Sequence, residues 1–91
     1  MNSYIVVARF KDGVTAEDIR ALIPAEQAQA KVLVEQGLLG FIKVAMPKRT
    51  VFIEAFGADE ANILSTIKSL PFSAIWDFEV FLTTPPAGVN F

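Results

Sequence analysis

The 91-residue chain contains no cysteine and no histidine. Without cysteine there is neither a disulfide nor a thiol nucleophile, and without histidine the chain lacks a Ser-His triad and the commonest zinc and haem ligand. We therefore expect no metal and no cofactor. No basic run is interleaved with aromatic residues and the net charge is −2, so nucleic acid is not an expected partner.

Long apolar runs are also missing. No stretch reaches the roughly 20 apolar residues that a membrane-spanning helix needs. The opening residues, MNSYIVVARFKDG, lack the basic segment and the long apolar segment of a signal peptide. These features predict a cytoplasmic protein with no membrane partner.

Apolar side chains are abundant: 53% of the residues are hydrophobic, and eight are phenylalanine. A domain of this size buries only part of its surface. The surplus of apolar side chains therefore predicts a homodimer or a higher homo-oligomer. We expect one domain over residues 1–91, in which residues 83–91 (TTPPAGVNF) form an extended C-terminal arm.

Apolar periodicity and turn signals predict the element order βαββαβ. The expected strands are residues 3–10, 38–45, 50–56 and 75–82, and the expected helices are 15–36 and 60–69. This is the ferredoxin-like α+β order, in which both helices cover one face of a four-stranded antiparallel sheet. Because the strands are apolar on both faces, we expect the bare face to pack against a second copy as a dimeric α+β barrel.

The first helix has predicted boundaries and one predicted irregularity. Thr15 and Asp18 have the spacing of a capping box, and Gly37 suits the position just after the helix end. Pro24 falls within the helical pattern and should kink the helix or split it into residues 15–23 and 24–36.

Glu26 occupies the apolar stripe of this helix. The stripe consists of Ile19, Leu22, Ile23, Ala30 and Leu33. A carboxyl group on such a face is costly to bury in its charged form, so its pKa should rise and the group could exchange protons near neutral pH. The alternative is that Glu26 lies at the rim of the stripe, where it reaches solvent or pairs with Arg or Lys.

Three segments resemble the muconolactone isomerase family of dimeric α+β barrel proteins. They are LIPAEQAQAKVLVEQGLL (22–39), the step Leu70-Pro71-Phe72, and WDFEVFLTTPPAG (76–88). Glu26 matches the acid that the family carries on its first helix, and Lys43 stands where the family carries a basic residue on the second strand. The chain departs from the family at FIKVAMPKRT (41–50) and at its end, where the isomerases have an aromatic-Arg pair, a Tyr/Asn-rich hairpin and a final His-Pro step.

The resemblance implies a cofactor-free proton shift on a butenolide ring in aromatic catabolism. Such a reaction needs a base, a cation or donor for the developing dienolate, and a dry pocket. In that interpretation Glu26 shuttles the proton, while Lys43 or Arg9 stabilises negative charge. An edge-strand lysine that blocks unwanted strand pairing is the alternative for Lys43.

Three further residues are candidates for substrate binding. Arg9 could anchor an anionic substrate, although we favour a cross-strand ion pair with Glu54, Asp77 or Glu79. Tyr4 could donate a hydrogen bond to an oxyanion, but such a residue is more often part of a core. Trp76 could line an apolar pocket or belong to the core.

Two other functions stay open from the sequence. One is a cofactor-free monooxygenase or cyclase that acts on a polycyclic aromatic compound, in a site built from aromatic walls. The other is a ligand-binding or assembly module without catalysis. A pocket that reaches Glu26 favours an enzyme, whereas a filled core with Glu26 in solvent favours a structural module.

Overall fold

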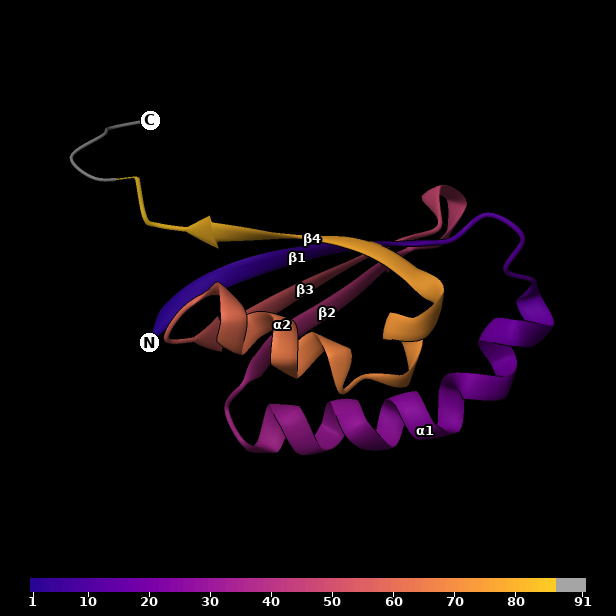
Figure 1. Ribbon diagram of the computed structural model, residues 1–91, viewed down its shortest axis with the longest axis horizontal. Coiled ribbons are helices and arrows are strands. Elements are labelled where there is room, and N and C mark those ends of the chain that lie inside the picture. The colour runs from indigo at the N-terminus through magenta and orange to yellow at the C-terminus, as the bar shows by residue number, and fades with distance from the viewer. Residues whose placement is uncertain (87–91) are drawn as a thin grey trace.

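The computed structural model describes residues 1–86 of the chain and confirms the predicted order of elements (Figure 1). The elements are β1 (Asn2–Phe10), α1 (Ala16–Glu35), β2 (Leu39–Ala45), the 3₁₀ turn η1 (Met46–Lys48), β3 (Thr50–Gly57), α2 (Glu60–Lys68), the 3₁₀ turn η2 (Pro71–Ile75) and β4 (Trp76–Thr83). In the predicted C-terminal arm, Thr83 still belongs to β4, and residues 87–91 lie outside the described residues.

The four strands form one antiparallel sheet in the order β2-β3-β1-β4, which places β1 between β3 and β4 as predicted. Both helices lie on one side of this sheet (Figure 1). The core is formed by the strand residues of that side together with apolar residues of the helices. Its fully buried members include Val6, Ala8, Ile53, Ile63 and Ile67. The fold is therefore the ferredoxin-like α+β fold.

Helix α1 begins and ends as its sequence predicts. The Thr15 side chain accepts a hydrogen bond from the Asp18 amide, and the Asp18 carboxylate accepts one from the Thr15 amide, which completes the capping box. At the other end Gly37 adopts a left-handed φ of 75°, and the amides of Gly37 and Leu38 bond back to the helix carbonyls.

Pro24 lies inside α1 without splitting it. The helix is continuous from Ala16 to Glu35. Its first part runs obliquely to the remainder in Figure 1, so the predicted kink is present and the predicted division is not.

The second side of the sheet, here called the open face, is covered by no helix within residues 1–86. Three of its phenylalanines remain exposed: Phe41 (39%), Phe52 (38%) and Phe81 (47%). Strand register arranges the open face in rows that run across the sheet. One row contains Lys43, Phe52, Val7 and Glu79, from β2 to β4. No helix among the described residues is long and apolar enough to cross a bilayer.

Candidate functional site

The carboxyl group of Glu26 is buried between α1 and η2, with 9% of the residue exposed. Its Oε1 atom accepts a hydrogen bond of 2.8 Å from the backbone amide of Phe72. Phe72 is the second residue of a 3₁₀ turn, so its amide has no partner within that turn. Glu26 therefore caps η2 from a different helix and ties two segments that lie far apart in the sequence.

Two opposing influences act on the pKa of Glu26. Burial removes water from the charged form and raises the pKa, and this is the larger influence. The hydrogen bond from the Phe72 amide stabilises the charged form and lowers the pKa, but by less. The net pKa is raised, as the position of Glu26 on the apolar stripe predicts.

A cluster of three aromatic rings is built around Phe72, the residue whose backbone amide binds Glu26. Phe72, which binds Glu26 through its amide, packs its ring edge-on against both Phe10 and Trp76, with ring centres 5.6 Å apart in each case. The Phe10 and Trp76 rings are 6.2 Å apart. We call Phe10, Phe72 and Trp76 the aromatic cluster.

Trp76 contributes an unusual polar group to the aromatic cluster. The residue is 3% exposed, and its Nε1 atom is buried without a hydrogen-bond partner in the described structure. A buried N–H that lacks an acceptor has lost its bond to water without replacement, at a cost of about 1–3 kcal/mol. Such a donor is available to an acceptor that enters the cluster.

Tyr4 lies on the same side of the sheet as Trp76. It is 4% exposed and is aligned with Ala55 and Leu82 on the neighbouring strands. Tyr4 thus belongs to the core, six positions along β1 from the Phe10 of the aromatic cluster. The sequence correctly indicates its helix-facing direction, together with that of Val6.

Lys43 and Arg9 lie on the open face, on the opposite side of the sheet from Glu26. Lys43 is aligned with Phe52, and its Nζ atom lies 5.3 Å from the centre of the Phe41 ring. Arg9 is aligned with Thr50 and Asp77. Within a single protomer the sheet therefore separates Lys43 and Arg9 from Glu26, and the structure does not bring these groups together.

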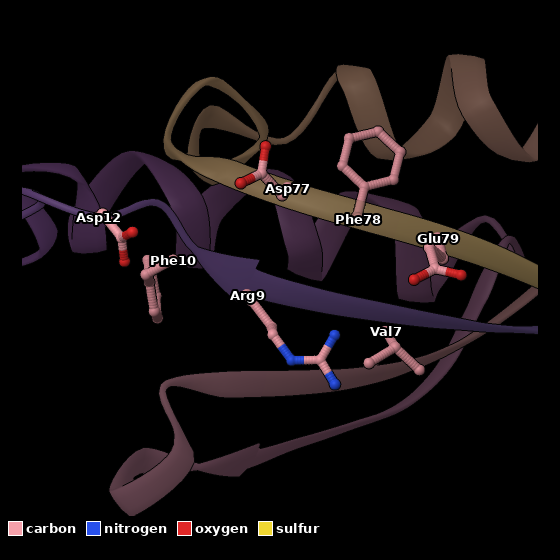
Figure 2. A pocket seen from close by; sticks show the side chains of 7 residues that line it. All are labelled: Val7, Arg9, Phe10, Asp12, Asp77, Phe78 and Glu79. Atoms are coloured by element: carbon pink, nitrogen blue, oxygen red, sulfur yellow. The ribbon is translucent and has the colours of Figure 1, made fainter.

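Arg9 lines a shallow hollow of about 270 Å³ at the edge of the open face. Figure 2 shows the lining residues Val7, Arg9, Phe10, Asp12, Asp77, Phe78 and Glu79. The Arg9 guanidinium extends toward Val7, away from the Asp77 carboxylate (Figure 2). The acids expected near Arg9 lie on the neighbouring strands, but Arg9 forms no salt bridge with Glu54, Asp77 or Glu79, so the favoured ion pair is not present in the described structure.

A second hollow, of about 390 Å³, lies between Leu38, Phe56 and the α2 residues Asn62, Ser65 and Thr66. Glu26 lines neither hollow. The burial of Glu26 and its bond from the Phe72 amide place η2 against the carboxyl group. Within residues 1–86, no three or more Asp or Glu side chains are grouped so that they could hold a metal ion.

Arg49 is a structural residue that the sequence does not single out. It adopts a left-handed φ of 49° at the end of η1. Its Nη2 atom donates to the carbonyl oxygens of Lys11 and Val14, each at 3.1 Å, and its guanidinium lies 6.0 Å from the centre of the Phe10 ring. Arg49 fixes the loop before α1 against β3.

Comparisons with known proteins add no family to this description. A scan against protein-family models finds no match to the chain. A search of curated proteins likewise finds no similar sequence.

Proposed function

We propose that this protein is a cofactor-independent, muconolactone isomerase-like enzyme that shifts a proton within a small anionic lactone or enolisable carbonyl compound. The observation that carries the proposal is the buried Glu26 carboxyl group, whose pKa is raised by desolvation. A carboxyl group in this state can take a proton from carbon and return it near neutral pH.

In the proposed reaction, Glu26 removes a proton from the carbon next to the carbonyl group and returns it to a second carbon of the conjugated system. The electron pair of the broken C–H bond passes into the dienolate and is recovered when the new C–H bond forms, so no oxidant or reductant is consumed. The dienolate oxygen needs a hydrogen-bond donor. We propose the Nε1–H of Trp76 for this role, since it lacks an acceptor in the described structure and its ring packs against Phe72, whose backbone amide binds Glu26.

The closed site requires a movement before the substrate binds. Glu26 and Trp76 are both buried, and η2 lies over the carboxyl group. The proposal therefore includes separation of η2 from α1, which breaks the bond from the Phe72 amide to Glu26. The substrate then takes the place of that contact.

Proton exchange with solvent tests the proposal without knowledge of the natural substrate. Small lactones and enolisable keto acids are incubated with the protein in deuterated water, and deuterium uptake at carbon is followed by NMR. We expect uptake with the wild type and its loss in Glu26→Gln. The matched control is Glu35→Gln, which changes an exposed glutamate of the same helix. Equal uptake in Glu26→Gln and wild type would overturn the assignment of Glu26 as the base.

We further propose that the protein forms a homodimer through its open face. The exposed rings of Phe41, Phe52 and Phe81 support this, since they give one face of a small domain a concentration of apolar surface. The proposal also retains an alternative without catalysis, an assembly module in which Glu26 serves only to hold η2. Ligand-independent dimerisation combined with the absence of any proton exchange would favour that alternative.

A further inference from the structure

The open face carries charges of opposite sign at its two edges. Lys43 lies on the edge strand β2 and Glu79 lies on the edge strand β4, in the same row across the sheet. Between them lie only the apolar side chains of Phe52 and Val7. Both charged residues are exposed.

Each edge strand also carries a phenylalanine on the open face. Phe81 stands on β4, aligned with Ile5 of β1, and Ile5 is aligned with Glu54 of β3. Phe41 lies on β2 at the other edge, on the same side of the sheet as Lys43, whose ammonium group lies over its ring. The β2 edge of the open face therefore presents Lys43 and Phe41, and the β4 edge presents Phe81 with two acids, Asp77 and Glu79.

We propose that a second copy of this chain covers the open face, with its strands parallel to those of the first and with Lys43 of each copy facing Glu79 of the other. The two-fold axis lies between β1 and β3 and runs along the strands. This arrangement rests on the homodimer proposed above and specifies its geometry. It places β2 of one copy over β4 of the other and forms two identical ion pairs, and it also brings Phe41 opposite Phe81.

The other simple two-fold axis does not match the charges. An axis that runs across the strands places β2 over β2 and β4 over β4. Lys43 then faces another Lys43 or a neighbouring β2 residue, and β2 carries no acid. Glu79 likewise meets Glu79 or a neighbouring β4 side chain. Like charges directly opposite one another disfavour a complex.

Glu54 lies close to the centre of the open face, and its side chain is displaced toward an edge. The Glu54 carboxylate lies over Gly40 of β2, at a point where any Cβ atom on residue 40 would collide with it. Gly40 lies between Leu39 and Ile42, where the register of β2 against β3 shifts. The lean of Glu54 toward β2 leaves Val7, Ile5 and Phe52 free to contact the second copy.

The lengths of the side chains are compatible with this geometry. Sheets that pack face to face are about 10 Å apart. A lysine from one edge and a glutamate from the facing edge bridge such a gap together. The two ion pairs lie at the rim of the interface, so they favour this two-fold axis over the alternative one. The apolar centre of the interface supplies most of the affinity.

Charge reversal tests the arrangement directly. In a homodimer of Lys43→Glu, the new glutamate at position 43 faces Glu79 of the other copy at both contacts. In a homodimer of Glu79→Lys, the new lysine at position 79 faces Lys43 of the other copy at both contacts. We expect each variant alone to dimerise about tenfold or more weakly than wild type, because like charges then face each other. A mixture of the two variants restores both ion pairs, so we expect a heterodimer with close to wild-type affinity. Native mass spectrometry detects it when one variant is isotope-labelled.

Matched controls separate this pairing from net charge. Lys31→Glu and Glu35→Lys carry the same net charges as the two test variants, but both sites are exposed on α1. We expect both controls to dimerise as wild type does and to form no preferred heterodimer. If the wild type dimerises but the two test variants dimerise equally well, or fail to form the heterodimer, the arrangement is overturned while self-association stands. A wild type that is monomeric at high micromolar concentration overturns both.

Discussion

Glu26 on α1 and the backbone amide of Phe72 at the start of η2 form a hydrogen bond of 2.8 Å across 46 residues of sequence. This contact joins the first half of the chain to the segment that leads into β4. It also defines the surroundings of the one carboxyl group whose pKa is raised by burial among the described residues. Structure and proposed catalysis therefore depend on the same oxygen atom, and the two roles make different predictions.

The first prediction concerns stability. Glu26→Ala leaves the Phe72 amide without its acceptor and opens a space beside η2, so we expect a loss of about 1–3 kcal/mol in the free energy of unfolding. Glu26→Gln keeps an oxygen that can accept the bond, and we expect it to stay within about 1 kcal/mol of wild type. Urea unfolding measures both. The exposed Glu35→Ala serves as a control, and an equal loss for Ala and Gln at position 26 would contradict the role of Glu26 as a cap.

The second prediction concerns pH. Because burial raises the pKa of Glu26, the folded state binds a proton more tightly than the unfolded state, where the pKa has its ordinary value of about 4.5. The stability that this group contributes is therefore fully present below about pH 4.5 and is lost as the pH rises through the folded-state pKa. We expect the wild type to lose stability relative to Glu26→Gln over that interval.

The measurement is urea unfolding of wild type and Glu26→Gln at closely spaced pH values from mildly acidic to neutral. Comparison with Glu26→Gln removes the contributions of other groups, such as Asp18, whose pKa is lowered by its hydrogen bonds with Thr15. A difference that instead grows in favour of the wild type with rising pH would mean that the bond from Phe72 outweighs burial.

The third prediction concerns Arg49. Arg49→Ala removes two hydrogen bonds to the carbonyls of Lys11 and Val14 and the contact with the Phe10 ring. We expect a loss of about 1 kcal/mol or somewhat more, measured by thermal or urea unfolding. Lys48→Ala changes the preceding exposed residue and should stay within about 0.5 kcal/mol of wild type. Equal effects at the two positions would show that the Arg49 contacts contribute little.

Local patterns predict the fold well because its boundaries are set by short-range chemistry. The capping box at Thr15, the left-handed Gly37 and the buried position of Glu26 each follow from residues within a few positions of one another. Pro24 is the instructive case, since a proline can be accommodated in a bent helix as well as at a break. Here α1 bends and continues.

The candidate site is less predictable because its partners are far apart in sequence. Nothing near Glu26 indicates that its hydrogen-bond donor is Phe72. The side of the sheet on which Lys43 lies is also undetermined locally, since β2 is apolar on both faces and its register changes at Gly40. The observed alignment of Lys43 with Phe52 is what places Lys43 on the open face, on the opposite side of the sheet from Glu26.

Trp76 is the only tryptophan in the chain, and it is packed against Phe72 within the closed aromatic cluster. Its intrinsic fluorescence therefore reports on one junction, the contact of η2 with β4, without any engineered probe. We expect blue-shifted emission while Trp76 is buried in the closed cluster. A red shift, or quenching by a collisional quencher, indicates that η2 has separated from β4 and exposed the Trp76 ring. Titration of candidate ligands against this signal can detect opening even when no turnover follows.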